Sequence, residues 1–214
     1  GPEKRSRVVT PHARRLTAYH EAGHAVVIHE LDSQDPVHQI TIVPRGQAGG
    51  MTISLPREDR AYLSKRELEE RIAVCLGGRV AEQLVLNDIS TGASNDLERA
   101  TQIARSMVTR YGFSERMGPV VYGTDPGETF LGRDFGQGKG YSENTASEID
   151  NEIRDIMDES YETARRILTE HMTELHRVAG VLMEREKISG EEFDALMKGE
   201  NLAPFGLDTP APAA

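Results

Sequence analysis

The sequence predicts a mainly α-helical fold with one short β-hairpin and a helical C-terminal part. Helices are predicted over residues 64–86, 94–111, 142–170, 172–187 and 189–198, and the first and the last of these open with capping boxes. Short stretches at 37–43 and 51–55 instead alternate apolar and polar residues, which is the period of a β-strand. A chain of 214 residues can bury one sizeable core.

The first helix is predicted between Thr10-Pro11 and Leu31-Asp32-Ser33. Threonine is a favourable N-cap, and proline fits the first helical turn because its missing N–H is not needed there. The apolar run at 25–28 indicates that this helix is buried. Gly23, inside the helix, costs about 1 kcal/mol relative to alanine. We therefore expect another backbone or a substrate to approach closely at Gly23.

The remaining elements follow from turn and cap residues. The glycine-rich link at 46–50 lies between the alternating stretches and predicts the turn of the hairpin. Capping boxes open the helices at Ser64 and Ser189, and Gly199 ends the last helix. The glycine-rich segment 123–140 is predicted to be a loop. An apolar stripe on helix 142–170 predicts core contacts, and it comprises Ile149, Ile153, Ile156, Met157, Ile167 and Leu168.

The first helix carries the sequence His20-Glu21-Ala22-Gly23-His24. Histidines four residues apart lie on one face of a helix, so both imidazoles can reach a single metal ion. This H-E-x-x-H arrangement is typical of zinc hydrolases, in which the intervening glutamate acts as the general base. The alternative is a pair of surface histidines around a solvated Glu21, but the apolar run that follows favours a buried site.

A catalytic zinc site needs a third protein ligand besides a water molecule. The longer pattern that would add a histidine fails, because Val27 and Glu30 occupy its glycine and histidine positions. Asp96 is a candidate because it follows a glycine-containing turn at the start of a helix, although aspartate is also favoured there by the helix dipole. Glu82, among apolar neighbours, is the competing ligand or a hydrogen-bonding partner of a ligating histidine. The residues alone leave both assignments open.

Further motifs occur in order over roughly residues 5–200. They are Ala18-Tyr19-His20-Glu21-Ala22-Gly23-His24-Ala25, Val43-Pro44-Arg45-Gly46, Gly77-Gly78-Arg79-Val80-Ala81-Glu82, Ser90-Thr91-Gly92-Ala93-Ser94-Asn95-Asp96-Leu97, Tyr111-Gly112-Phe113-Ser114-Glu115 and Phe130-Leu131-Gly132-Arg133. Together they resemble the peptidase domain of the FtsH family of membrane-anchored, ATP-dependent zinc proteases. The resemblance implies a helical zinc-peptidase domain in which Zn²⁺ is held by His20, His24 and Asp96. It makes Glu21 the general base and leaves Glu82 as a partner of a ligand.

The same resemblance implies unfolded or misfolded protein substrates, an AAA ATPase module upstream in the full-length protein, and a homo-hexamer. It also implies the cytoplasmic domain of a protein anchored in the cell membrane. Within this segment we expect no membrane insertion, because no run of eighteen apolar residues occurs. Nor do we expect ATP binding, because the glycines and lysine at 136–140 lack the spacing of a phosphate loop.

The residues also suggest how the chain is divided. Residues 1–4 are interpreted as a cleavage scar of an expression tag with a linker, because the chain starts with Gly1-Pro2. Residues 5–199 are assigned to the zinc metallopeptidase domain, and 200–214 are predicted to be a disordered tail.

Composition excludes several other functions. The net charge of −10 argues against nucleic acid or anionic lipid as a partner, since both favour a basic surface. Cys75 is the single cysteine, so no internal disulfide can form, and its apolar neighbours predict a buried small side chain. The remaining alternative to a zinc endopeptidase is a catalytically idle assembly module with a structural zinc, which would need four protein ligands.

Overall fold

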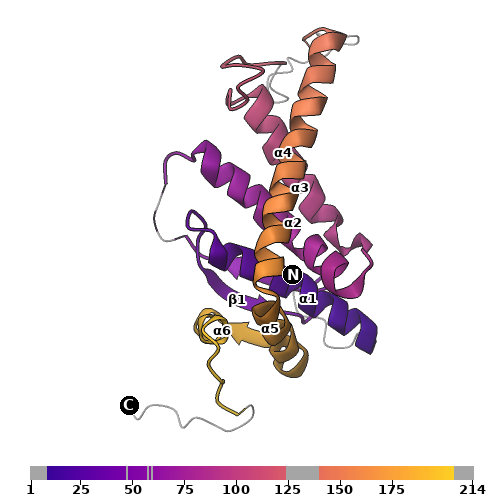
Figure 1. Ribbon diagram of the computed structural model, residues 1–214, viewed down its shortest axis with the longest axis vertical. Coiled ribbons are helices and arrows are strands. Elements are labelled where there is room, and N and C mark those ends of the chain that lie inside the picture. Colours follow the sequence, from indigo (N-terminus) through magenta and orange to yellow (C-terminus); the bar gives the residue numbers. More distant parts are fainter. Residues whose placement is uncertain (1–8, 47, 57, 59, 124–139, 205–214) are drawn as a thin grey trace.

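The structure is a computed structural model that describes residues 9–46, 48–56, 58, 60–123 and 140–204. The interpretations of residues 1–4, of the 130–133 motif, of nearly all of the 123–140 loop and of most of the C-terminal tail lie outside these residues. Within them the fold is mainly α-helical with a small sheet, as predicted (Figure 1). None of the described helices is both long and apolar enough to span a bilayer.

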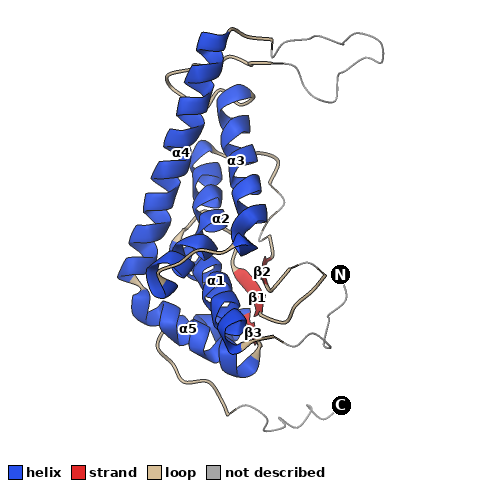
Figure 2. Cartoon of the chain, turned by 90° about the vertical axis from the view of Figure 1, so that its right-hand side faces the viewer, coloured by secondary structure: helices blue, strands red, loops and turns tan. Residues whose placement is uncertain are grey.

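The elements follow one another in a simple order. They are α1 (Pro11–Glu30), β1 (Val37–Thr41), β2 (Met51–Ser54), α2 (Lys65–Leu86), the 3₁₀ turn η1 (Thr91–Ala93), α3 (Ser94–Thr109), α4 (Glu143–Glu170), α5 (Met172–Arg185), β3 (Lys187–Ser189) and α6 (Gly190–Met197). The long helix α4 runs beside α2 and α3, while the sheet lies next to α1 (Figure 2). The predicted stripe of α4 is core, with Ile149, Ile153, Ile167 and Leu168 buried and the rest half-buried.

Helices α1 and α2 cross where both carry glycine. A Cβ atom added to Gly23 would lie 2.4 Å from the carbonyl oxygen of Gly77, and one added to Gly77 would lie 2.9 Å from the carbonyl oxygen of Gly23. Neither position can accept a larger side chain without separating the helices. The predicted close approach at Gly23 is therefore confirmed, and it brings the motif helix directly against α2.

The sheet has the strand order β2-β1-β3, so β2 forms one edge. The predicted hairpin is confirmed, because β1 and β2 pair antiparallel with Ile40 opposite Thr52. The helix predicted over 172–187 is too long. It ends at Arg185, Glu186 adopts a φ of 69°, and Ile188 pairs with Ile40 of β1. This strand was missed because its pairing partner lies far away in the chain, where local periodicity carries no signal.

The predicted caps are mostly present. The Thr10 hydroxyl accepts a hydrogen bond from the amide of Ala13, and Ser189 forms a complete capping box with Glu192. At Ser64 one of the two hydrogen bonds of the predicted capping box forms, because the Ser64 hydroxyl accepts from the amide of Glu67. The Glu67 carboxylate pairs with Arg60 instead of returning to Ser64. Gly199 ends α6 with a φ of 82°, a conformation that glycine adopts without strain.

Candidate metal centre

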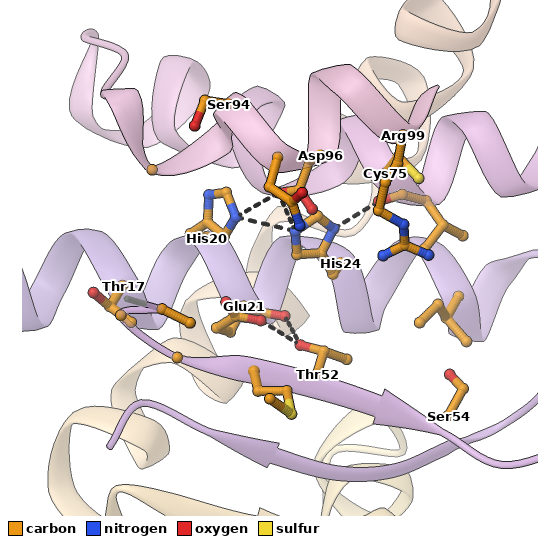
Figure 3. Close-up of a pocket in the computed structure, with 18 of the residues that line it drawn as sticks. Thr17, His20, Glu21, His24, Thr52, Ser54, Cys75, Ser94, Asp96 and Arg99 are labelled. Atoms are coloured by element: carbon orange, nitrogen blue, oxygen red, sulfur yellow. Dashed lines mark hydrogen bonds and ion pairs between the residues drawn. The ribbon is translucent and has the colours of Figure 1, made fainter. Parts of the chain in front are cut away.

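The structure brings His20, His24 and Asp96 together at one point (Figure 3). The Nε2 atoms of His20 and His24 lie 3.0 Å apart. Each also lies close to Oδ2 of Asp96, at 3.0 Å for His20 and 3.1 Å for His24. Both histidines come from α1, whereas Asp96 comes from the first turn of α3. The crossing of α1 and α2, with α3 packed on α2, thus joins residues that are 76 positions apart.

The outer nitrogens of the two imidazoles face hydrogen-bond acceptors. His24 Nδ1 lies 2.6 Å from the carbonyl oxygen of Val74, and His20 Nδ1 lies 2.9 Å from Oε2 of Glu82. A carbonyl and a carboxylate accept but do not donate, so each Nδ1 carries the proton. In the neutral ring, Nε2 then presents a lone pair, whereas in a protonated ring Nε2 carries a proton that it can donate to Asp96. Two such lone pairs and an anionic oxygen of Asp96 converge, and a divalent cation fits this set of donors.

The charges around the centre favour a cation as well. Burial lowers the pKa of His20, but hydrogen bonds to Asp96 and Glu82 outweigh it and raise the pKa to about 10. Burial raises the pKa of Asp96, but the hydrogen bonds from His20 and His24 prevail and hold it well below its usual range. A proton that these side chains share would compete with a metal ion for the same negative site.

Gly78 makes room for the ring of His20. A Cβ atom at this position would lie 2.5 Å from Cε1, 2.6 Å from Nε2 and 2.7 Å from Nδ1 of that ring. These distances are about 1 Å shorter than ordinary carbon contacts, so only glycine leaves the imidazole in this place. The Gly-Gly pair of α2 therefore has two functions, since Gly77 packs against α1 and Gly78 accommodates the first histidine.

Glu82 connects His20 with the loop that leads to Asp96. Its side chain is fully buried, and its second oxygen, Oε1, accepts a hydrogen bond of 2.5 Å from the hydroxyl of Ser90. That hydroxyl in turn accepts from the amide of Gly92, 3.1 Å away, just before α3. Glu82 contacts the outer nitrogen of His20, away from the shared point, which favours a partner of a ligand over a ligand. Sequence reasoning missed Ser90 and the Val74 carbonyl, although Ser90 opens one of the motifs quoted above.

A cleft of about 940 Å³ contains the candidate centre. His20, Glu21, His24 and Asp96 line it on the helical side, and Met51, Thr52 and Ser54 of β2 line it on the other. Glu21 is 7 % exposed, and its carboxylate accepts a hydrogen bond from the hydroxyl of Thr52. Cys75 is buried as predicted, but it also lines the cleft, and burial raises the pKa of its thiol.

The family is shown by comparison with known proteins. The model of peptidase family M41 matches residues 7–196. The chain belongs to peptidase family M41. This M41 chain is 57 % identical over 202 residues, or 94 % of its length, to "ATP-dependent zinc metalloprotease FtsH 1" of Thermoanaerobacter sp. (strain X514). It is 53 % identical over 92 % of its length to "ATP-dependent zinc metalloprotease FtsH" of Caldicellulosiruptor bescii. It covers 33 % and 32 % of these two relatives, so it spans about a third of their length.

Residues of three of the motifs in this sequence lie around the candidate centre. The motif histidines, the aspartate of the Asn-Asp pair and the glutamate of the Gly-Gly-Arg helix meet in one cluster. Glu30, which stands where a longer zinc motif would place a histidine, instead pairs with His29 and His171 away from the cluster. Glu30 is therefore not available as a third ligand.

Proposed function

We propose that this chain is the peptidase region of a zinc-dependent endopeptidase, with His20, His24 and Asp96 as the zinc ligands and Glu21 as the general base. The observation that carries the proposal is the convergence of three acceptor atoms beside a buried carboxylate in one cleft. Membership of a peptidase family, and relatives whose names specify zinc, support both the reaction and the metal.

In this mechanism the side chains have separate tasks. When held by His20, His24 and Asp96, Zn²⁺ would lower the pKa of a water to about 7 and polarise the scissile carbonyl. Glu21 accepts at its carboxylate the proton that the attacking water loses, and it passes this proton to the nitrogen of the leaving amine. Glu82 and the Val74 carbonyl hold the rings of His20 and His24 in the tautomer that ligates.

The geometry also favours an extended substrate. Among the described strands β2 lies at the edge of the sheet, and it lines the cleft, so its outer side offers backbone groups with which an extended peptide can pair. A folded protein does not present a peptide bond in this form. We therefore propose unfolded or misfolded proteins as substrates. The acidic chain, with a net charge of −10, does not suit nucleic acid.

The larger assembly is proposed from the names and lengths of the relatives and from the resemblance of the motifs to the FtsH family. Their names specify ATP dependence, and they are about three times as long as the part of them that this chain matches. We propose an AAA ATPase module in the full-length protein that delivers substrate, a homo-hexamer, and a cytoplasmic position next to the cell membrane.

A catalytically idle module with a structural zinc fits the centre less well. Structural zinc sites are closed by four protein ligands, whereas catalytic sites keep a position open. The described residues form one metal-binding group with three protein ligands, and Glu21 lies beside this group without belonging to it.

The test measures zinc content and the cleavage of a dye-labelled unfolded protein by the wild type and by Glu21→Gln. The amide is nearly isosteric but accepts no proton, so we expect unchanged zinc and cleavage reduced at least about 100-fold. A chelator should abolish wild-type cleavage, and added zinc should restore it. Glu148→Gln, an exposed change on α4, is the control and should behave like the wild type. Cleavage by Glu21→Gln at the wild-type rate would exclude Glu21 as the base, and cleavage that resists chelation would exclude the zinc mechanism.

A further inference from the structure

We propose that Thr52 of β2 is a positioning residue, whose hydroxyl holds the carboxylate of Glu21 in the orientation needed for proton transfer. The inference rests on the proposed function, because it concerns the same reaction. It adds a residue of the sheet to a centre that the sequence motifs place entirely on helices.

Among the residues that the structure describes, two acceptors lie within reach of the Thr52 hydroxyl, and both belong to Glu21. Its Oγ1 lies 2.7 Å from the carboxylate atom Oε2 and 3.1 Å from the backbone carbonyl oxygen. A hydroxyl has one proton to donate. The shorter distance and the negative charge of the carboxylate favour donation to Oε2, since hydrogen bonds to ionised acceptors are shorter and stronger.

The segment around Thr52 leaves the Glu21 side chain little freedom. A Cβ atom added to Gly50 would lie 3.0 Å from Cγ of Glu21, so the backbone before Thr52 packs directly on the stem of this side chain. The close-up shows the carboxylate of Glu21 directed from α1 toward β2, where Thr52 meets it (Figure 3). The base is thus held on the β2 side of the cleft.

This position determines which kinetic constant depends on Thr52. A substrate that pairs with β2 places its scissile bond between this strand and the metal centre, next to Glu21. The Thr52 hydroxyl gives its single proton to Glu21, so it orients the base and has no proton left to donate to a substrate carbonyl. Misplacement of a catalytic group by about 1 Å can cost about 100-fold in rate. Loss of the hydroxyl should therefore lower kcat and leave KM nearly unchanged.

The experiment compares Thr52→Val with Thr52→Ser. Valine keeps the shape and the strand preference of threonine without the hydroxyl, whereas serine keeps the hydroxyl. We expect kcat for a quenched fluorescent peptide to fall about 10- to 100-fold in Thr52→Val, with unchanged zinc content and thermal unfolding. Thr52→Ser should retain most of the wild-type kcat. Thr163→Val makes the same change at a half-buried position of α4, where the hydroxyl donates to the carbonyl oxygen of Glu159, and it should not alter either constant.

Two results would overturn the inference. One is a Thr52→Val enzyme with wild-type kcat, and the other is a Thr52→Val enzyme in which KM rises while kcat stays unchanged. If Thr52→Val does not fold, Thr52→Ala provides a second variant without the hydroxyl and carries the same expectation. If the wild type shows no chelator-sensitive cleavage, the proposed function fails, but a crystal structure of Thr52→Val still decides about Thr52. A Glu21 carboxylate in its present position would then refute the positioning role, and a displaced one would support it.

Discussion

Gly78→Ala should damage the candidate metal centre although it replaces none of the proposed ligands. The added Cβ would lie 2.5 Å from Cε1 of His20, whereas carbon atoms in contact are ordinarily about 3.5–4.0 Å apart. Gly78 lies inside α2, whose backbone is fixed by its hydrogen bonds, so the imidazole has to move by about 1 Å. That shift displaces Nδ1 from Glu82 and Nε2 from His24 and Asp96.

The size of the effect follows from two opposing contributions. Overpacking of a well-packed interior costs about 1–3 kcal/mol. Alanine in place of glycine inside a helix returns about 1 kcal/mol. The metal-free variant should therefore lose up to about 2 kcal/mol, which lowers Tm by up to about 8 °C in a domain of this size. Loss of the contact that orients His20 should weaken zinc binding by about 10- to 100-fold.

Zinc affinity is measured by competition with a chromophoric chelator, and Tm by calorimetry of the metal-free protein. Gly180→Ala is the matched control, because Gly180 also lies in a helix and its added Cβ would meet no atom within 4 Å. It should raise Tm by about 2–4 °C and leave the zinc affinity unchanged. If Gly78→Ala gains the same stability as Gly180→Ala and binds zinc as tightly as the wild type, the proposed steric role of Gly78 is refuted.

Other substitutions separate the acidic residues and probe the thiol. Asp96→Asn should reduce zinc binding and abolish cleavage, whereas Glu82→Gln should keep bound zinc in an impaired enzyme. If zinc titrations show a larger loss of affinity for Glu82→Gln than for Asp96→Asn, the two residues exchange roles. Ser90→Ala leaves a fully buried oxygen of Glu82 without its donor, so zinc affinity should fall by about 10-fold, as seen in the same titration. Because burial raises the pKa of Cys75, iodoacetamide at pH 8.5 should alkylate it more slowly than a free cysteine. In denaturant the two rates should be equal. If Cys75 of the native protein reacts as fast as a free cysteine, its burial is contradicted.

The helices were predictable because their signals are local. Caps such as Thr10 and Ser189 bond to amides within the next turn, so neighbouring residues decide where a helix starts. The pair His20 and His24 is also local, since a helix places residues four apart on one face whatever surrounds it. The end of α5 was predicted wrongly because its signal is not local. Lys187 and Ile188 pair with β1, and that pairing depends on where a distant strand lies.

The sequence by itself determined the family, the helical character and one histidine pair that can ligate a metal. Tertiary structure decided which acidic residue meets that pair. Asp96 shares the point with His20 and His24, whereas Glu82 contacts only the outer nitrogen of His20. It also decided that Thr52 holds Glu21 and that Gly78 admits the His20 ring. These contacts close long loops of chain, and their geometry is fixed by how α1, α2, α3 and β2 pack rather than by any spacing along the sequence.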